Sequence, residues 1–485
     1  MSPYLMLVSI FLPVAGGCGI GLFKFKNRRS EAVFTSAVVL LAAALTWALI
    51  LNRPQGNAEL IRFTQNLRVS LRLDGAGAIF AGLVATLWPL STLYAFEYMQ
   101  DDARHSTFFA FYTISFGVTL GVAMAGNLLT MYFFYEMLTL STLPLVMHTM
   151  TKRSVHAGRK YLYYSLGGTA FAFIGLVFTI IYGETAAFTA GGFLSPEAVS
   201  SRGGVLLVIY FLTFCGFGVK AAIFPLYAWL PDASVAPTPV TALLHAVAVV
   251  KSGVFAIIRV TYFCFGAAFL TGTWAQYAAM AIALFTMLFG SVMAVKETHL
   301  KRRLAYSTVA NLSYILSAVM LLTEAGLEAG LVHMVFHGLM KIGLFFCAGA
   351  VICKTGREYI DELYGIGRKM RATFACFTVS ALALVGVPPL AGFVSKWKIA
   401  LAQAAEGGAM GYIGLAVLIV CAFLTAVYML TVVVKAYFPQ KGMVVRDARD
   451  PGWKMLVPIV MVTAAVVAFG VWSEPIVSAV GLLAP

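Results

Sequence analysis

The stretch that decides the fold runs from Thr213 to Arg259 and reads TFCGFGVKAAIFPLYAWLPDASVAPTPVTALLHAVAVVKSGVFAIIR. It contains two segments apolar enough to span a bilayer, and these hold Lys220, His245 and Lys251. An ammonium group at the centre of a membrane helix costs at least ~2.5 kcal/mol, so ionisable residues at that depth are typical of functional sites. These three residues are therefore candidate site residues.

A proline interrupts the first of these segments. Pro225 follows Lys220 by five residues. Because proline has no N–H and its ring displaces the carbonyl four residues earlier, the helix is predicted to break near Ala221. A broken hydrophobic helix beside a lysine is the arrangement with which transporters bring polar backbone and a titratable group together at membrane depth.

A second interrupted span, LALVGVPPLAGFVSKWKIA, begins at residue 382. Its two prolines, Pro388 and Pro389, free the carbonyls of Leu384 and Val385, and Lys396 follows. Paired interrupted helices in the two halves of a chain indicate an inverted-repeat transporter. We therefore expect a first repeat over 108–262 and a second over 275–435.

Composition places the chain among polytopic membrane proteins. Of its 485 residues 61% are hydrophobic and 11% are charged, which excludes an ordinary soluble domain. The net charge of +14 falls in the connections between apolar spans, so topology explains it better than nucleic-acid binding does. No soluble domain interrupts the spans, and we expect one transmembrane domain over 1–485.

The cysteine pattern does not favour a redox centre. Seven cysteines lie in or beside apolar spans and form no CxxC pair, so neither an iron–sulfur site nor a disulfide framework is predicted. We expect no cofactor and no metal, and any redox chemistry is expected to belong to another chain.

Segments of about 20 apolar residues predict fourteen membrane spans. They cover 3–23, 31–51, 76–96, 108–126, 128–150, 162–182, 205–228, 239–262, 275–295, 304–323, 329–353, 372–401, 411–435 and 454–474. Connections after odd-numbered spans carry 23 Lys and Arg against 5 after even-numbered ones. By the positive-inside rule the odd connections are cytoplasmic, which puts both termini on the outer side of the cytoplasmic membrane of a bacterium or archaeon.

Glu136 is the acidic residue expected at membrane depth, in the fifth span. An unpaired carboxylate in lipid stays protonated, so Glu136 is interpreted as the partner of a cation on another helix. The alternative is a neutral glutamic acid that forms a hydrogen bond in a helix interface.

In the eleventh span His333, His337 and Lys341 recur at i, i+4 and i+8. At about 100° per residue they share one helix face, which makes a proton relay possible. The alternatives are a metal site, which needs a further carboxylate or thiolate ligand, and histidines that form ordinary interhelical hydrogen bonds.

His245 and Lys251 lie six residues apart, about 240° around an ideal helix. Either the eighth span is irregular between them or one of the two residues is structural. Arg259 lies near the end of the same span and is interpreted as an anchor whose guanidinium extends to the membrane surface.

These segments together resemble a known family. The block from Lys220 to Arg259, the segment FHGLMKIGLFFCAG from residue 336, the segment PPLAGFVSK from residue 388 and the span of Glu136 are similar to the antiporter-like subunits shared by respiratory complex I, Mrp-type cation/proton antiporters and energy-converting membrane hydrogenases. The resemblance implies an all-α fold of about fourteen helices, with two inverted five-helix repeats and broken helices 7 and 12.

The resemblance also implies roles for individual residues. The positions that match the family's buried charges and histidines are Glu136, Lys220, His245, Lys251, His333, His337, Lys341 and Lys396. One complex I branch carries glutamate at the position of Lys396, so lysine favours the other branch or the Mrp and hydrogenase types. The sequence stops about ten residues after the fourteenth span, so the long lateral helix of the most distal complex I subunit is not expected.

The hypothesis from the sequence is a proton-translocating subunit of a multi-subunit membrane complex, with Na⁺/H⁺ antiport as a variant. Separation of Glu136 from Lys220 would release a proton, which would pass to Lys251 with His245 and His337 as intermediates and leave from Lys396. In a complex I or hydrogenase assembly the chain would be a component of a translocating oxidoreductase. The alternatives are an independent secondary transporter for Na⁺ or a small solute, and a membrane scaffold without transport.

The charge asymmetry predicts the topology directly. Single cysteines that replace Arg153, Arg302 or Arg368 in a cysteine-free background should resist impermeant thiol reagents added outside intact cells, because these connections are expected in the cytoplasm. Labelling after the membrane is permeabilised is the control. Labelling of all three positions from outside would reverse the orientation.

Overall fold

The computed structural model describes residues 2–54, 56–64, 67–439 and 448–483. Part of the basic connection that follows the thirteenth expected span, 440–447, lies outside these residues. The secondary-structure elements of the described chain are all helices except for one short antiparallel hairpin of β1 and β2.

The elements up to the first break are α1 (Leu5–Leu22), α2 (Arg28–Asn52), β1 (Ala58–Arg62), β2 (Arg68–Leu71), α3 (Gly75–Tyr98), α4 (His105–Ala123), α5 (Leu128–Val146), α6 (Lys152–Tyr182) and α7 (Pro196–Gly218). The central elements are α8 (Trp229–Ala233), α9 (Thr238–Ala246), α10 (Val249–Ile258), the π-helical η1 (Arg259–Phe265), α11 (Ala267–Leu270), α12 (Trp274–Lys296), α13 (Leu300–Val319) and α14 (Glu324–Thr355). The remaining elements are the 3₁₀ turns η2 (Ile360–Glu362) and η3 (Ile366–Arg368), then α15 (Arg371–Val385), α16 (Ala391–Glu406), α17 (Ala409–Tyr437), α18 (Trp453–Val471) and α19 (Glu474–Leu483).

The chain is an integral, polytopic, all-helical membrane protein. Among the described residues twelve helices, or runs of adjoining helices, are long and apolar enough to cross a membrane. The spans expected from the sequence correspond to single helices or to runs of shorter ones, except that the expected span 205–228 includes the non-helical segment 219–228. The expected span 304–323 corresponds to α13, which begins with three basic residues and is not among the twelve, and the span 372–401 is divided into α15 and α16.

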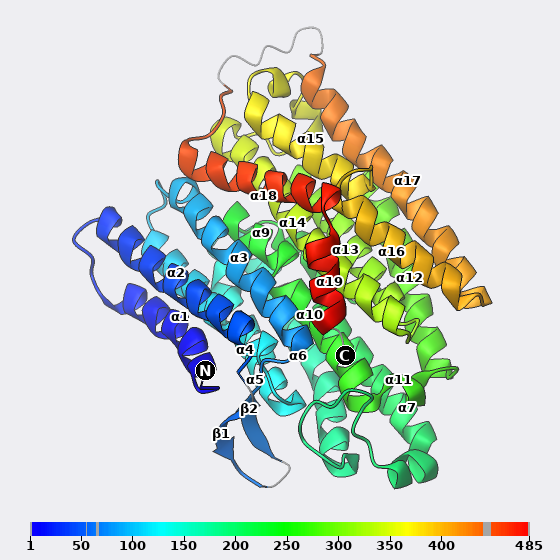
Figure 1. Cartoon of the computed structure of the whole chain (residues 1–485). Coiled ribbons are helices and arrows are strands. Elements are labelled where there is room, and N and C mark those ends of the chain that lie inside the picture. The colour runs from blue at the N-terminus through cyan, green and yellow to red at the C-terminus, as the bar shows by residue number, and fades with distance from the viewer. Residues whose placement is uncertain (1, 55, 65–66, 440–447, 484–485) are drawn as a thin grey trace.

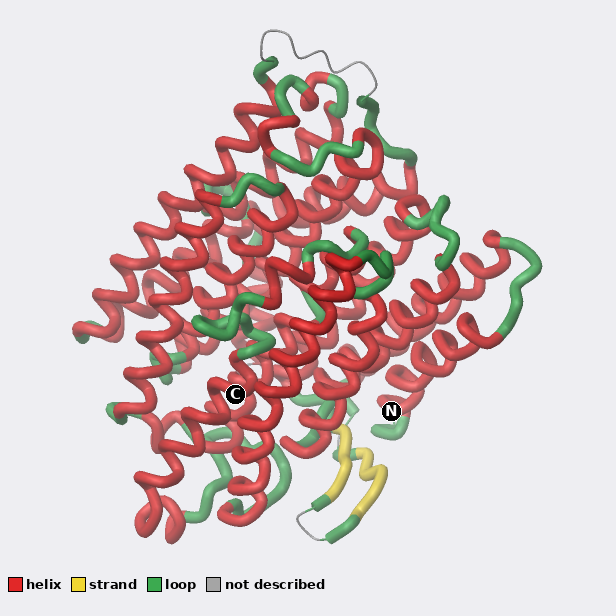
Figure 2. Tube along the Cα trace, turned by 180° about the vertical axis from the view of Figure 1, so that it is seen from behind, coloured by secondary structure: helices red, strands yellow, loops and turns green. Residues whose placement is uncertain are grey.

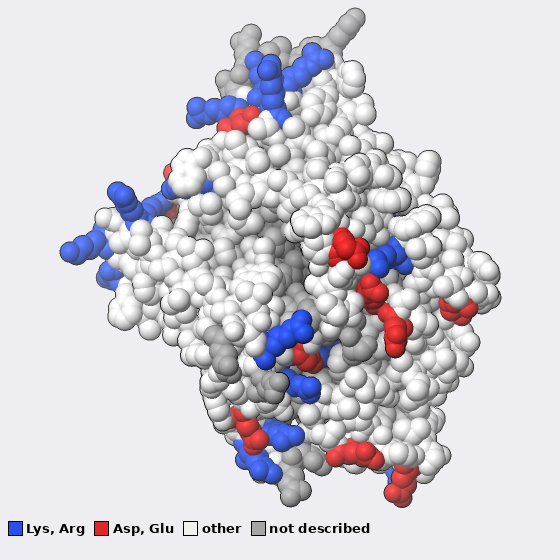
Figure 3. Space-filling view, viewed as in Figure 1, with Lys and Arg blue, Asp and Glu red and all other residues white. Residues whose placement is uncertain are grey.

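The helices pack side by side as one bundle (Figure 1). The carboxyl end of α17 lies at the top of that view and the α1–α2 connection at its left edge, whereas the hairpin and the α6–α7 connection lie at the bottom. Seen from behind, the hairpin projects from the same end of the bundle (Figure 2). Most of the face in Figure 3 carries no charged side chain, as expected for a surface in contact with lipid.

The centre of the bundle is formed by the α9–α10–η1 run and α14. In the most apolar 18-residue segment of the α9–α10–η1 run every residue is buried, and in that of α14 89% of the residues are buried. Helix α14 contacts α9, α13, α15, α16 and α18. Candidate site residues on these elements are therefore shielded from lipid on every side.

Side-chain caps begin several helices. Asn127 accepts a hydrogen bond from the N–H of Thr130 at the start of α5, and Thr323 accepts one from Gly326 at the start of α14. At the other end of α14, Gly356 has a φ of 69°, a conformation that favours glycine. These caps satisfy N–H and C=O groups that a helix end leaves free, which is costly to omit in a membrane.

The predicted first break is confirmed. Helix α7 ends at Gly218, and a non-helical segment runs over 219–228 before α8. Ala222 in this segment has a φ of 56°. The indole N–H of Trp229, the first residue of α8, donates to the carbonyl of Val219 over 2.8 Å. This hydrogen bond satisfies a backbone carbonyl within the break.

The predicted second break is also confirmed. Helix α15 ends at Val385, Gly386 has a φ of 96°, and α16 begins at Ala391. The ammonium of Lys396 donates to the carbonyls of Leu384 and Val385, over 2.7 and 3.1 Å. These are the two carbonyls that the prolines were expected to free.

The eighth expected span is irregular between His245 and Lys251, which is one of the two interpretations of their spacing. Helix α9 ends at Ala246 and α10 begins at Val249. The N–H groups of Val247 and Ala248 both donate to the carbonyl of Leu243, over 2.9 and 2.8 Å. This local change of register separates His245 from Lys251.

The interpretation of Arg259 as a surface anchor is wrong. Its side chain is fully buried and forms two hydrogen bonds of 2.6 and 2.5 Å with the carboxylate of Asp74, which caps α3. Burial alone would raise the pKa of Asp74, but the Arg259 charge and hydrogen bonds hold this pKa below its ordinary value. The guanidinium also lies over the rings of Phe188, Phe255 and Phe263, which fixes it inside the bundle.

The hairpin is a finding that the sequence did not predict. Its strands pair antiparallel, with Ala58 opposite Leu71 and a register shift between Glu59 and Ile61. It occupies the connection 52–75, the one even-numbered connection that carries four arginines.

Close packing at the first break gives a prediction. A Cβ atom on Gly253 of α10 would lie 2.4 Å from the nitrogen of Ala221 and 2.7 Å from the carbonyl carbon of Lys220. Gly253→Ala must therefore displace the broken segment, and we expect it to lower the free energy of unfolding by about 1–3 kcal/mol.

The matched control is Gly167→Ala in α6, where a Cβ would meet no atom within 4 Å. It should leave the stability unchanged or raise it slightly, because alanine favours a helix by about 1 kcal/mol over glycine. Equal thermal melting temperatures for the two purified variants would contradict the packing argument.

Candidate functional site

The candidate residues lie at the centre of the bundle. The side chains with no exposed surface are those of Lys220, His245, Lys251, His333, His337 and Lys341. Lys396 is 5% exposed and Glu136 is half-buried. The helices that carry these residues form a continuous series of contacts across the bundle, in which α13 takes part. Helix α5 contacts α10, α10 contacts α13, α13 contacts α14, and α14 contacts α16.

Lys220 occupies the break after α7. Its ammonium donates to the backbone carbonyl of Tyr135 on α5 and lies 3.5 Å from the centroid of the Tyr135 ring. A cation over an aromatic face is stabilised by the quadrupole of the ring. The tyrosine next to Glu136, rather than Glu136 itself, is thus the direct partner of this lysine.

Glu136 lies beside that contact without joining it. Glu136 follows Tyr135 in the chain, yet the described residues contain no ion pair between Glu136 and Lys220 within 4.0 Å. One carboxylate oxygen of Glu136 is buried and has no hydrogen-bond partner within the described part of the chain. The structure therefore has the two groups apart, with the carboxylate free to accept a proton or a donor.

Lys251 and His337 are in direct contact. Among the described residues, no other two of the eight predicted site residues form a hydrogen bond or ion pair with each other. The Lys251 nitrogen lies 2.8 Å from Nδ1 of His337, with α10 supplying the lysine and α14 the histidine. The other ring nitrogen of His337 is buried without a partner among the described residues. A hydrogen bond between two basic nitrogens needs one donor and one acceptor, so a single proton lies between them.

The three residues of α14 share a face, as predicted, but each contacts a different helix. Nδ1 of His333 lies 2.9 Å from the hydroxyl of Ser395 on α16. The rings of His333 and His337 are 5.9 Å apart and nearly parallel. Lys341 donates to the carbonyl of Leu304 on α13 over 3.0 Å and to the hydroxyl of Ser307.

Lys396 is held at the second break. Besides the two carbonyls of α15, its nitrogen lies 5.0 Å from the centroid of the Tyr314 ring on α13. Tyr314 also packs against His333, with 5.7 Å between the ring centroids. Tyr314 thus lies between the histidine of α14 and the lysine of α16.

His245 has different surroundings from the other candidates. Its ring stacks on Phe345 at 4.7 Å, and both ring nitrogens lack a partner among the described residues. It lies in the last turn of α9, next to the irregular Val247–Ala248 step. A neutral imidazole so placed has one N–H to donate and one nitrogen that can accept a proton.

Sequence reasoning missed the partners of the charged residues. Tyr135, Ser395, Tyr314 and Ser307 are common residue types in membrane helices, and no spacing rule connects them to lysines or histidines far away in the chain. Only Tyr135 had a signal in the sequence, because it is an aromatic residue adjacent to Glu136, the predicted partner of a buried cation.

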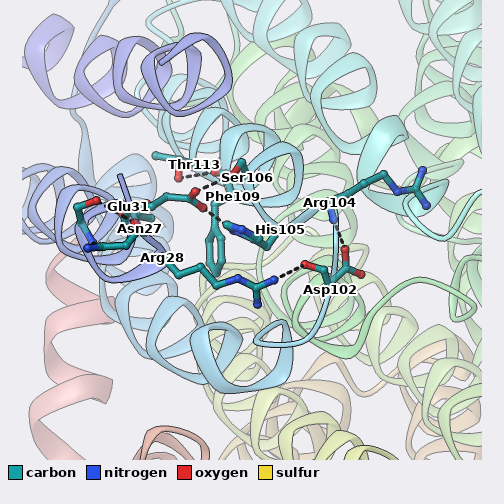
Figure 4. Close-up of polar contacts among 11 residues, drawn as sticks. Asn27, Arg28, Glu31, Asp102, Arg104, His105, Ser106, Phe109 and Thr113 are labelled. Carbon is teal, nitrogen blue, oxygen red and sulfur yellow. Dashed lines mark hydrogen bonds and ion pairs between the residues drawn. The ribbon is translucent and has the colours of Figure 1, made fainter. Parts of the chain in front are cut away.

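A further polar cluster lies away from this line, where α2 and α4 begin (Figure 4). The buried carboxylate of Glu31 accepts from the hydroxyl of Ser106 over 2.6 Å and lies 2.9 Å from Nδ1 of His105. Arg28 donates to the carbonyl of Asp102 over 3.3 Å. These contacts hold the start of α2 against α4 and do not extend to the buried lysines.

The buried lysines and histidines of the candidate site, which we call the buried line, are all nitrogen bases. Within the described ranges no group of three or more His, Cys, Asp or Glu side chains is placed to hold a metal ion. What the arrangement offers is a succession of amines and imidazoles that bind and release protons.

Comparison with known proteins identifies relatives. The family described as NADH:quinone oxidoreductase/Mrp antiporter, transmembrane, matches residues 125–433. NADH-quinone oxidoreductase subunit N of Desulforudis audaxviator is 33% identical over 427 residues, which cover 84% of this chain and 83% of the relative. Subunit L of Mycobacterium tuberculosis is 31% identical over 448 residues, 89% of this chain and 69% of the relative.

A third relative is the Na(+)/H(+) antiporter subunit A1 of Staphylococcus aureus, which is 25% identical over 496 aligned positions. The alignment includes 96% of this chain but only 61% of that relative. The chain therefore corresponds to a part of the antiporter subunit.

Solved structures share the fold. A chain of an archaeal membrane-bound sulfane sulfur reductase has a TM-score of 0.84 and 23% identity, with 98% of this chain and 96% of that chain covered. Chains of the Mrp complex from Dietzia and of respiratory complex I from Thermus thermophilus give TM-scores of 0.84 and 0.83, with 19% and 22% identity. They cover 99% of this chain, and 96% and 98% of their own.

The Lys251–His337 contact gives a prediction. In His337→Phe the Lys251 amine loses its described partner, so the free energy of unfolding should fall by about 1–3 kcal/mol. The double variant Lys251→Met with His337→Phe should recover most of this loss, because both polar groups are gone. His245→Phe, whose ring already stacks on Phe345, is the control and should change the stability little. Additive losses in a thermal-unfolding cycle of the purified assembly would show that the two residues do not interact.

Proposed function

The chain belongs to the NADH:quinone oxidoreductase/Mrp antiporter membrane family, and from that premise we propose that it translocates protons as an antiporter-like subunit of a multi-subunit membrane complex. The observation that carries the proposal is the Lys251–His337 contact at the centre of the bundle. Two bases that share one proton over 2.8 Å form an elementary transfer step within the membrane.

The neighbouring groups extend this step in both directions. On one side the backbone of Lys220 packs against Gly253, two residues after Lys251, while the Lys220 ammonium lies against Tyr135. On the other side the His337 ring is stacked near His333, which in turn packs against the tyrosine beside Lys396. We place the proton path from Lys220 through Lys251 and His337 to Lys396, with the free nitrogens of His245 as a lateral acceptor.

The half-buried carboxylate of Glu136 loads the first lysine. An opposite charge nearby favours the ammonium form of a buried lysine, and its withdrawal favours release. Glu136 is next to Tyr135, which contacts the Lys220 ammonium, but Glu136 forms no ion pair with Lys220 in the described chain. A small movement of α5 against the broken segment 219–228 would therefore change the charge balance at Lys220 and drive the proton onward.

Transport against a membrane potential needs a driver. Each elementary charge moved against 100 mV costs ~2.3 kcal/mol, and the described line offers proton carriers rather than an electron acceptor. We infer that other membrane subunits supply the energy, either from a redox reaction or from a counter-ion gradient. The relatives include a subunit of a NADH-quinone oxidoreductase and a subunit of a Na(+)/H(+) antiporter, which correspond to these two kinds of driver.

We further propose that the chain lies in the cytoplasmic membrane with both termini on the outer side, and that 108–262 and 275–435 are inverted repeats. The charge asymmetry supports the orientation. The two breaks support the repeats, since a lysine lies in or beside each and contacts a carbonyl of a neighbouring helix.

A second candidate function, Na⁺/H⁺ antiport, is favoured by the second break. The carbonyls of Leu384 and Val385 that hold the Lys396 ammonium are oxygen ligands of the kind that hard cations prefer. A Na⁺ ion could replace the ammonium there when Lys396 moves away. This function predicts that proton movement depends on Na⁺, whereas the leading proposal does not.

The test of the proposed function is Lys396→Arg. Arginine keeps the charge but does not deprotonate in proteins, so the variant should assemble and yet lose proton translocation at least tenfold in vesicles reconstituted with the purified assembly. Lys369→Arg, at the exposed end of η3, is the matched control and should retain the wild-type rate. Wild-type translocation in Lys396→Arg would exclude Lys396 as a carrier, and repetition without Na⁺ separates the two candidate functions.

A further inference from the structure

An ion pair closes the outer part of the α14–α16 interface. The Lys398 ammonium lies 2.8 Å from the Glu328 carboxylate. The two side chains are 30% and 29% exposed, so each has one side toward solvent and one toward the protein. In the described chain this is the sole ion pair between these helices.

The pair joins the same two helices as the His333–Ser395 contact. Ser395 and Lys398 are three residues apart on α16 and therefore share a helix face. Ser395 contacts His333, and Lys398 contacts Glu328, which precedes His333 by five residues on α14. At 1.5 Å per residue these two contacts are about 7.5 Å apart along α14, with the ion pair nearer the end at which α14 begins.

That end of α14 is the outer one in the proposed orientation. The same helix end carries Glu324, which is exposed. Helix α19 passes beside the pair, because a Cβ on Gly481 would lie 3.9 Å from the carboxyl carbon of Glu328. On the face in Figure 3, a basic side chain lies among acidic ones over the region of α16 and α19.

The charged and titratable groups around the pair come from four elements. Helix α14 contributes Glu324 and His333, α16 contributes Lys396, and α19 begins with Glu474, which is exposed and bonded to Ser478. From α13, Tyr314 lies near Lys396 and His333. Glu324 and Glu474 are exposed, whereas Glu328 is half-buried. Of these three carboxylates, Glu328 is therefore the proton acceptor nearest to the protein interior.

We propose that Glu328 is the proton-release group of this chain and that Lys398 is its gate. This inference rests on the proposed proton translocation and extends it beyond Lys396. The Lys398 ammonium lies against the Glu328 carboxylate, and the exposed side of that carboxylate is within reach of outer water.

The transfer balances as a sequence of two proton exchanges. An N–H bond of Lys396 or of the His333 imidazolium breaks, and an O–H bond forms on the Glu328 carboxylate through intervening water, while Lys398 turns to solvent. The O–H bond then breaks toward outer water, and Lys398 returns to the carboxylate. The ion pair blocks return of the proton, because Glu328 accepts one only while Lys398 is displaced.

The test compares variants of the purified assembly in vesicles. Glu328→Gln should reduce the proton-translocation rate at least tenfold, because the amide cannot carry the proton, while its thermal melting temperature stays close to that of the wild type. Glu324→Gln, one turn away and exposed, should stay within twofold of the wild-type rate. Lys398→Arg should keep the rate, because it preserves the counter-charge. Lys398→Gln should slow translocation, and a higher outer pH should restore part of the rate.

The outcomes separate this inference from the proposed function. Loss of transport in Lys396→Arg together with a wild-type rate in Glu328→Gln would overturn the release site and leave the relay in place. A wild-type rate in Lys396→Arg would instead contradict the relay itself. A lower melting temperature in Glu328→Gln with unchanged transport would show that the pair is a structural clamp, which also overturns the inference.

Discussion

The contact on which the rest of this structure depends is that between a lysine ammonium and backbone carbonyls at a helix break. A broken helix inside a bilayer exposes carbonyls that no water can satisfy, at a cost of several kcal/mol each. Lys396 donates to both carbonyls freed at the end of α15, and Lys220 donates to a carbonyl of α5. At the second break the lysine stabilises the freed carbonyls, whereas at the first break Trp229 donates to the carbonyl of Val219 and Lys220 joins the break to α5.

These hydrogen bonds do not prevent proton loss. An ammonium group has three donors, and the neutral amine keeps two. Lys396 can therefore hold the carbonyls of Leu384 and Val385 in either state, and Lys341 can likewise keep its contact with the carbonyl of Leu304. A protonation change at these positions alters the charge without removing the hydrogen bonds that maintain the fold.

Local signals made much of this predictable. Proline positions located both breaks, and the i, i+4, i+8 spacing placed three residues of α14 on one face. Contacts between distant segments were not predictable, such as that of Asp74 with Arg259, 185 residues apart. The step at Val247–Ala248 has neither proline nor glycine to mark it, and the hairpin lies in a connection that hydrophobic periodicity does not describe.

The Lys251–His337 contact also determines how the two halves of the chain communicate. Two unit positive charges 4 Å apart repel by about 4 kcal/mol at an effective dielectric constant of 20, and these two nitrogens are only 2.8 Å apart. The pair therefore carries one proton at a time. A proton that arrives at Lys251 from the first half requires the departure of the one on His337 toward the second, so transfer on one side of the contact is coupled to transfer on the other without any large movement of α10 or α14.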